Sequence, residues 1–146
     1  MQISIREATT KDYPSIYLLL KEFSAFQQTP DKVTITPERM IEEKNLIHCL
    51  VAVNPEGVII GFASYFFAFY SWSGKALYLD DLYVCADYRR QKIGTQLLQK
   101  VLRLAKETGC WKVRWQVSKW NDPAISFYKK IGAVVDDVES NCDLLL

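Results

Sequence analysis

Three strand-like segments follow one another in the middle of the chain with only short turns between them, and this feature constrains the fold most. They cover residues 48–53, 58–69 and 76–84, and they are rich in β-branched and aromatic side chains. The connections at residues 54–57 and 71–74 have the composition of tight turns. Since a tight turn joins antiparallel neighbours, the centre of the chain is predicted to be a run of β-hairpins.

Helices are predicted before these strands. After a first strand at residues 2–7, a helix starts at Thr9 or Thr10 and has Pro14 in its opening turn. A second, short helix starts at Thr36 and ends near Lys44. The buried face of the first helix is predicted from apolar side chains at helical spacing, namely Ile16, Leu19, Leu20, Phe23 and Phe26.

A strand–helix–strand crossover follows the hairpins. A helix at residues 94–106, a strand at 112–117 and a helix from Asp122 to Gly132 are predicted, and the tail at 133–146 is predicted to hold one or two short strands. The element order β-α-α-β-β-β-α-β-α-β predicts one α+β domain over residues 1–146, with a mixed sheet. Ligands of such sheets tend to bind at the carboxyl ends of the parallel strands.

Charge and composition exclude several classes of function. Eighteen basic and seventeen acidic residues give a formal net charge of +1, which argues against a nucleic-acid partner. No apolar run has the length of a membrane span and no secretory leader is visible, so we expect a cytoplasmic protein with no membrane partner. The four cysteines form no CxxC pair and His48 is the single histidine, so no metal is expected and the thiols are expected to be reduced.

The segment between the third central strand and the next helix has the features of a phosphate site. A turn that opens onto a helix N-terminus presents unpaired N–H groups and the positive end of the helix dipole. Here the turn also carries two arginines and a lysine, which would add charge-assisted contacts. The alternative is a basic loop that merely begins a helix. The residues concerned are Arg89, Arg90, Gln91, Lys92, Ile93, Gly94 and Thr95.

Two motifs in the second half of the chain resemble those of the GNAT superfamily of N-acetyltransferases. The run at residues 89–94 resembles the family's pyrophosphate loop, Arg/Gln-x-x-Gly-x-Gly/Ala, with Lys92 in place of the first glycine. The spacing from Asn121 to Tyr128 to Gly132 resembles the family's Asn-x6-Tyr-x3-Gly motif. Residues 48–52, 70–75 and 77–84 resemble the diamine (spermidine/spermine) N-acetyltransferase branch in particular.

The resemblance implies a fold, a co-substrate and an assembly. The GNAT fold has a mixed sheet of about seven strands flanked by helices, and its members take acetyl-CoA and transfer the acetyl group directly to an amine. The resemblance also implies a homodimer. By position, the loop at 89–95 would hold the pyrophosphate, backbone groups of the stretch Leu82, Tyr83 and Val84 would pair with the pantetheine arm, and Asn121 and Tyr128 would lie near the thioester.

Chemistry assigns roles to three of these residues. A phenol held at the sulfur can protonate the departing CoA thiolate, which makes Tyr128 the candidate general acid, although its helical spacing is equally that of a packed side chain. Asp80 and Asp81 are the candidates for holding the substrate's ammonium group and taking its proton. The resemblance favours Asp80 as the catalytic one, because it matches the family's acidic position. Because neighbouring strand residues point to opposite faces, a regular strand would offer only one of them, and a bulge would change this. A solvated acidic pair is the alternative.

Further residues are candidates for the acceptor side. Trp72 can stack over an alkylammonium group or serve as a packing lid. Arg114 and Gln116 match substrate-side positions of the branch, and Phe26 with Gln27 stand where polyamine enzymes often carry Tyr-Glu. The predicted cleft thus has acidic residues, Asp80 and Asp81, on one side and the neutral pair Phe26 and Gln27 on the other. Because each ammonium group taken from water needs a partner, the site is expected to favour a short diamine or a lysine-like amine over spermine. The resemblance thus implies acetyl transfer to a primary amine of a small diamine-like or polyamine-like substrate. The alternatives are a GNAT acting on another amine, such as a lysine analogue, an aminoglycoside or a peptide N-terminus, and a non-catalytic acyl-CoA-binding module.

Overall fold

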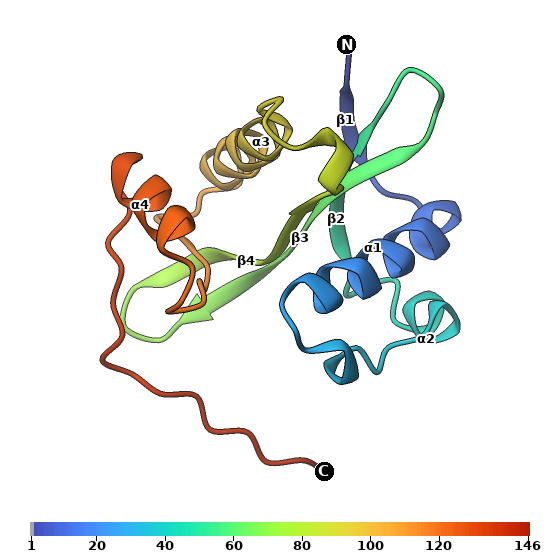
Figure 1. Cartoon of the computed structure of the whole chain (residues 1–146). Helices are drawn as coiled ribbons and strands as arrows, with labels where there is room; N and C mark the ends of the chain where they lie inside the picture. Colours follow the sequence, from blue (N-terminus) through green and yellow to red (C-terminus); the bar gives the residue numbers. More distant parts are fainter. Residues whose placement is uncertain (1) are drawn as a thin grey trace. The chain divides into compact units, whose positions relative to one another are not determined.

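The computed structural model describes residues 2–146, which divide into two units (Figure 1). The first unit extends to Trp115 and contains the sheet, and the second is Gln116–Leu146. Within the described residues, no helix is both long and apolar enough to cross a bilayer. The two units are described in turn.

The sheet of the first unit has five strands in the order β1-β2-β3-β4-β5. The central antiparallel hairpins are confirmed, because β1 pairs with β2, β2 with β3 and β3 with β4 in antiparallel register, whereas β4 and β5 are parallel. The strand bounds are Ser4–Glu7 for β1, His48–Val53 for β2, Ile59–Tyr70 for β3, Gly74–Val84 for β4 and Val113–Arg114 for β5.

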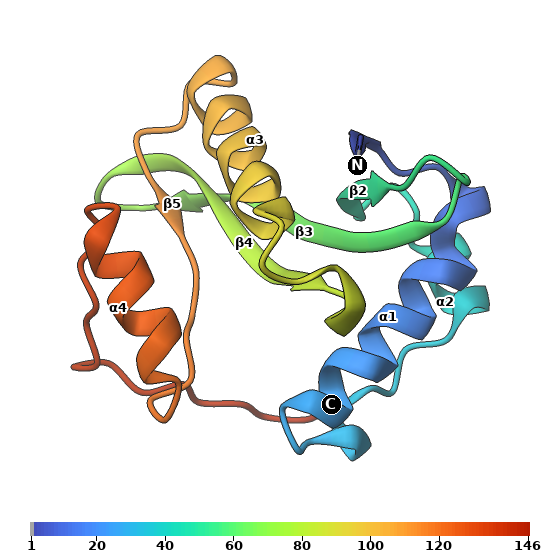
Figure 2. The same cartoon turned by 45° about the horizontal axis from the view of Figure 1, so that its top comes forward.

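Three α-helices cover the sheet of this unit, and Figure 2 shows α1 and α3 on opposite faces. Thr36 caps α2 by accepting a hydrogen bond from the Arg39 N–H group at 3.1 Å, as its position before a proline predicts. The helices are α1 (Tyr13–Phe26), α2 (Pro37–Glu42) and α3 (Ile93–Glu107), with three short 3-10 turns at Thr10–Asp12, Pro30–Lys32 and Ala86–Tyr88.

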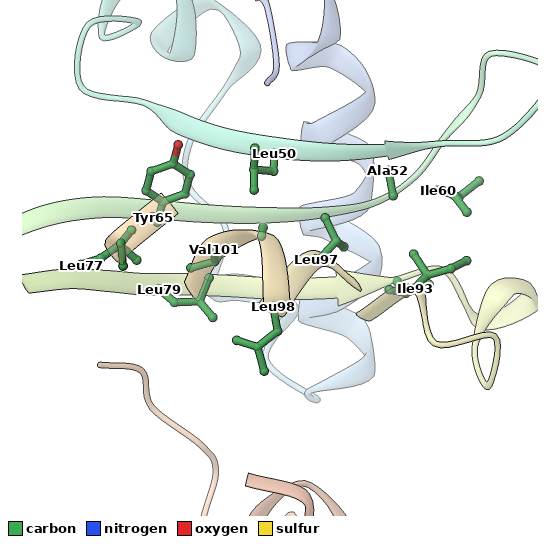
Figure 3. Close-up of a cluster of buried hydrophobic side chains, with 13 residues drawn as sticks. Leu50, Ala52, Ile60, Tyr65, Leu77, Leu79, Ile93, Leu97, Leu98 and Val101 are labelled. Carbon is green, nitrogen blue, oxygen red and sulfur yellow. The ribbon is translucent and has the colours of Figure 1, made fainter. Parts of the chain in front are cut away.

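The core has two parts, one on each face of the sheet, because strand side chains alternate between faces. On one face α3 packs Leu97, Leu98 and Val101 against β2, β3 and β4 (Figure 3). On the other face Ile16 and Leu19 of α1 pack against Val51, Phe62 and Tyr83. The prediction for α1 is wrong at one position, because Phe26 at its last turn is 49% exposed.

The second unit contains one helix, α4 (Asp122–Lys130), and the predicted strands of the tail are absent from it. Gly132 follows α4 with φ of 98°, the left-handed conformation expected at a helix end. No residue of 133–146 pairs in a strand, and Val134 and Val138 stay exposed. An apolar pattern makes a strand only where a neighbouring strand completes its hydrogen bonds. The fold class is as predicted, but the structure has five strands rather than about seven.

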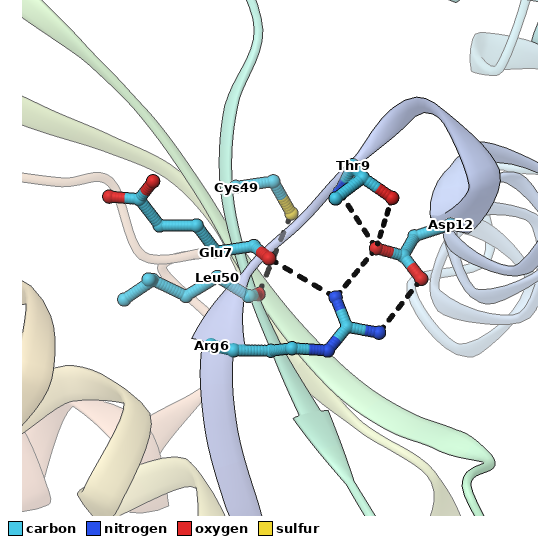
Figure 4. Close-up of polar contacts among 6 residues, drawn as sticks. All are labelled: Arg6, Glu7, Thr9, Asp12, Cys49 and Leu50. Atoms are coloured by element: carbon cyan, nitrogen blue, oxygen red, sulfur yellow. Dashed lines mark hydrogen bonds and ion pairs between the residues drawn. The ribbon is translucent and has the colours of Figure 1, made fainter.

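An ion pair ties β1 to the start of α1. The guanidinium group of Arg6 contacts both carboxylate oxygens of Asp12, at 2.7 and 3.0 Å, and the Thr9 N–H group donates to the same carboxylate at 2.7 Å (Figure 4). Asp12 is buried, and the hydrogen bonds from Arg6 lower its pKa to about 2. The pair therefore fixes where the chain turns from the sheet into the helix.

Replacing this carboxylate should destabilise the fold. Asp12→Asn keeps the shape but removes the charge-assisted bonds, so the free energy of unfolding at pH 7 should fall by about 2 kcal/mol. Because the pKa of Asp12 is lower in the folded state, its contribution is full above about pH 4 and is lost as the pH falls towards 2. Urea unfolding at pH 7 and at about pH 3 measures this.

The control for Asp12→Asn is the exposed pair of Arg39 and Glu43, whose Nε and Oε1 atoms lie 3.0 Å apart. Glu43→Gln should cost less than about 0.5 kcal/mol, since exposed ion pairs contribute little. Equal losses of unfolding free energy in the two variants would contradict the role given to the Arg6–Asp12 pair. So would a difference in unfolding free energy between wild type and Asp12→Asn that is as large at about pH 3 as at pH 7.

Candidate functional site

The strand β4 has one edge that is only partly paired. Its parallel neighbour β5 pairs at two positions, Leu77 with Val113 and Tyr78 with Arg114. From Leu79 to Val84, β4 continues with β3 as its one neighbour among the described residues. Backbone N–H and C=O groups on the other edge therefore remain available to a ligand that lies along the strand.

The direction of these backbone groups follows from two hydrogen bonds. The N–H group of Cys85 points to β3, where it donates to the carbonyl of Ile60 at 2.9 Å. Since successive residues alternate, Val84 and Leu82 present their backbone groups to the open edge. In agreement, the Val84 carbonyl accepts a hydrogen bond from the side chain of Arg89 at 3.1 Å. Tyr83 lies between them and buries its ring against Phe23, at 4.9 Å between ring centroids.

The loop that follows β4 leads into the N-terminus of α3. Lys92 precedes the helix with φ of 63° and ψ of 18°, so the residue in the glycine position does take the left-handed conformation. Arg90 has φ of 64° as well. No side chain caps α3, and its first N–H groups, from Ile93 to Thr95, precede the first residue that can bond within the helix. The exposed side chains of Arg90, Gln91 and Lys92 surround this terminus. These residues fit a phosphate group.

Arg89 is turned towards α1. Its guanidinium group lies 4.7 Å from the ring centroid of Phe26 and 5.3 Å from that of Tyr83, and its Nε atom donates to Val84. From the sequence, Arg89 was expected in the phosphate loop and Phe26 on the acceptor side. The structure brings these two residues together, a contact that no sequence pattern indicates.

A β-bulge places the two candidate carboxylates. Ser64 of β3 pairs with Asp81, whereas the next residue, Tyr65, pairs with Leu79, so Asp80 is an extra residue in β4. The bulge breaks the alternation of faces, and the charge of Asp80 acts on both Asp81 and Tyr78. The structure therefore brings the carboxylates together, as a regular strand would not.

The protein holds these carboxyl groups at raised pKa values. Burial raises the pKa of Asp81 to about 6, and the neighbouring charge of Asp80 adds to this effect. Asp80 is exposed, yet the protein around its carboxyl group removes enough hydration to raise its pKa too. A carboxylate that titrates near neutral pH can accept a proton and release it again, as a general base must.

The thiols are poor nucleophiles. Burial raises the pKa of Cys49 to about 12, and burial together with the carboxylate of Glu22 raises that of Cys85 to about 11. The reactive thiolate is disfavoured at both positions. All four cysteines are free, and within residues 2–146 no three His, Cys, Asp or Glu side chains gather as a metal would require.

The remaining acceptor-side candidates of the first unit come from three different segments of the chain. Trp72 is fully exposed in the turn between β3 and β4, and Gln27 is half-buried at the end of α1. Arg114 of β5 is exposed beside Tyr78 and places its guanidinium group 4.7 Å from the ring centroid of Tyr70. The sequence analysis did not single out Tyr70, Tyr78 or Glu22, since their role depends on pairings between strands and helices.

The second unit holds the other candidates. Asn121 caps α4, its side-chain oxygen accepting from the Ala124 N–H group at 3.4 Å. Tyr128 lies on α4, and burial raises its pKa. Gln116 is exposed.

Comparisons with known proteins agree with this arrangement. The Acetyltransferase (GNAT) family matches residues 5–133. Thialysine N-epsilon-acetyltransferase of Bos taurus is 34% identical over 142 residues, which cover 90% of this chain and 84% of the relative. L-ornithine N5-acetyltransferase of Arabidopsis thaliana is 35% identical over 115 residues, which cover 78% of this chain and 48% of the relative.

A solved structure supports the fold. An aminoglycoside acetyltransferase from an uncultured soil sample superposes with a TM-score of 0.79 at 22% identity, over 99% of this chain and 96% of that one. The identity is too low to say more than that the fold is shared. The family match spans nearly the whole chain and includes the strands, the loop and the helices described above. The chain therefore belongs to the GNAT family of acetyltransferases.

Proposed function

We propose that this protein transfers the acetyl group of acetyl-CoA directly to a primary amine of a small diamine-like or lysine-like substrate. The observation that carries the proposal is the bulge in β4, which sets Asp80 and Asp81 beside an open strand edge. That edge leads directly to the uncapped N-terminus of α3. Amine recognition and phosphate binding are thus supported by one continuous stretch of chain.

Acetyl-CoA, which GNAT acetyltransferases use, would supply the thioester. The N–H groups of Ile93 to Thr95 and the side chains of Arg90, Gln91 and Lys92 would hold its pyrophosphate. Leu82 and Val84 would hold the pantetheine arm through backbone groups, and Asn121 would lie near the thioester. Arg89 would act mainly by bracing β4, since its Nε atom already bonds the Val84 carbonyl.

The carboxylates would bind the amine and remove its proton. Asp80 would hold the ammonium group, and a proton would pass to Asp81, directly or through water, before the amine attacks the carbonyl carbon. The new C–N bond forms as the C–S bond breaks, and the departing thiolate takes a proton from Tyr128. The second proton of the attacking nitrogen then passes to the Tyr128 phenolate, directly or through water, which leaves a neutral amide and restores the acid. No covalent enzyme intermediate is proposed, which agrees with the raised pKa values of Cys49 and Cys85.

The relatives support a small amine as acceptor. Their names refer to thialysine, to L-ornithine and, in a human protein 35% identical over 140 residues (89% of this chain, 20% of that protein), to spermidine/spermine. We further propose a single functional domain, a cytoplasmic location and a homodimer, in which the exposed side chains of Phe66 and Phe69 would gain a partner surface. Size-exclusion chromatography with light scattering tests the dimer.

The proposal predicts turnover that depends on Asp80. Wild type should release free thiol from acetyl-CoA with ornithine, lysine and putrescine, and less efficiently with spermine. Asp80→Asn should raise KM and lower kcat/KM about 10–100-fold for every amine, because an amide holds an ammonium group less tightly. Glu107→Gln, at the exposed end of α3, is the matched control and should leave kcat/KM unchanged.

Three results would contradict this, in whole or in part. Binding of acetyl-CoA without turnover of any amine would indicate a non-catalytic acyl-CoA-binding module. Equal effects of Asp80→Asn and Glu107→Gln on kcat/KM would show that Asp80 is a solvated surface residue without a role in amine binding. Turnover confined to an aminoglycoside or a peptide N-terminus would keep the chemistry and replace the acceptor.

A further inference from the structure

Two cations meet over one aromatic ring at the junction of β4 and β5. The guanidinium group of Arg114 lies 4.7 Å from the ring centroid of Tyr70, and the ammonium group of Lys112 lies 4.8 Å from the same centroid. Lys112 also lies 4.6 Å from the ring of Trp111. The ring faces hold the cations in place, since an aromatic face attracts positive charge.

These cations have no anionic partner in the described part of the chain. Neither Arg114 nor Lys112 forms an ion pair or a side-chain hydrogen bond there. They repel each other, and burial together with the charge of Arg114 lowers the pKa of Lys112. Arg114 is exposed, so a solute can reach its donors. Adjacent unpaired cations attract an anion, and a guanidinium group matches a carboxylate in shape as well as charge.

The cation pair and the carboxylates lie along the same strand. Arg114 pairs with Tyr78 across the β4–β5 ladder, and paired residues point to the same face of a sheet. Asp80 follows Tyr78 by two residues, at the bulge in β4. Both charges act on the Tyr78 hydroxyl group, Asp80 raising its pKa and Arg114 lowering it. A negative and a positive side chain thus both act at Tyr78.

From this arrangement we infer that Arg114, assisted by Lys112, binds the carboxylate of an amino-acid acceptor whose side-chain amine is held at Asp80. The inference rests on the proposed function and specifies its acceptor. An ω-amino acid such as ornithine carries an ammonium group and a carboxylate joined by a short aliphatic chain, which matches the two signs of charge. A polyamine instead brings a further cation towards Arg114 and Lys112, which repel it.

Matched substrates isolate the carboxylate. Putrescine is ornithine without its carboxylate, and cadaverine bears the same relation to lysine. Wild type should have the higher kcat/KM for the amino acid of each pair. Arg114→Gln should lower kcat/KM for ornithine and lysine about 10–100-fold, as expected for loss of a charged hydrogen bond, while the values for putrescine and cadaverine stay within about twofold or rise.

Three further variants complete the test. Arg114→Lys keeps the charge and should retain part of the preference for the amino acid over its matching diamine. Lys112→Gln should lower this preference less than Arg114→Gln does. Arg103→Gln removes an exposed cation of α3 and should leave the ratio unchanged. Melting temperatures establish that each variant is folded.

The outcomes separate the two proposals. Turnover of all four amines with no preference in wild type, or an equal loss for both members of a pair in Arg114→Gln, overturns the role of Arg114 and leaves the proposed function intact. Turnover of none of them overturns both. If Arg114→Gln lowers kcat/KM for ornithine and lysine but not for putrescine and cadaverine, the inference is supported.

Discussion

Tyr128→Phe is expected to lower kcat about 10²–10⁴-fold while the protein still folds and binds acetyl-CoA. The phenylalanine ring keeps the packing on α4 and removes the proton that would go to the departing thiolate. Burial raises the pKa of Tyr128, so its hydroxyl group stays protonated at neutral pH, which is the form that an acid requires. Steady-state kinetics with ornithine and acetyl-CoA measure the loss.

A second tyrosine serves as the control for Tyr128→Phe. Tyr17 lies on α1, where its ring contacts the ammonium group of Lys21, at 5.6 Å from the centroid. Tyr17→Phe should leave kcat unchanged. If kcat of Tyr128→Phe also stays within about twofold of wild type, its hydroxyl group is not the acid and the side chain only packs.

Gly94→Asp is expected to abolish the stabilisation of the protein by acetyl-CoA. Wild type should melt at a higher temperature with acetyl-CoA, because a ligand that binds only the folded state stabilises it. In the variant, a carboxylate would stand beside the N–H groups that are proposed to hold the pyrophosphate, and like charges repel. Differential scanning fluorimetry over a range of acetyl-CoA concentrations measures the shift.

The fold itself should tolerate this substitution. A Cβ atom on Gly94 would meet one neighbour, the Cγ2 atom of Val84, at an ordinary 3.8 Å. An acidic residue in the first turn of a helix also complements the helix dipole. Gly94→Ala adds the same atom without charge, so it should retain most of the shift. A full shift in Gly94→Asp would show that the pyrophosphate lies elsewhere.

Lys92→Gly serves as a second comparison at this loop. Lys92 occupies a left-handed conformation, which costs a non-glycine residue about 1–2 kcal/mol, and glycine relieves that cost. The apo variant should therefore melt at least as high as wild type. Any loss of the acetyl-CoA shift in this variant then reports the lysine charge alone.

Local features of the sequence determined much of the fold. Tight turns at residues 54–57 and 71–74 specified the antiparallel pairing of β2, β3 and β4, because so short a connection leaves no other partner. The cap at Thr36 and the glycine at 132 marked helix ends, because each satisfies a local backbone requirement. Lys92, which stands in place of the first glycine of the loop, takes the left-handed conformation that glycine adopts most easily.

Features that depend on partners distant in the chain were decided by the tertiary structure. The tail at residues 133–146 has apolar residues but no strand, and β5 shortens to two residues, since a strand exists only where a neighbour completes its ladder. The sequence showed two adjacent aspartates, but the register of β3 against β4 makes Asp80 the bulged residue. Burial, with a smaller contribution from the charge of Asp80, raises the pKa of Asp81 to about 6. The sequence listed Arg114 among several candidates, and its pairing with Tyr78 and its stacking on Tyr70 decided which charge it faces. Register and burial arise only when separate segments meet, so no local pattern contains them.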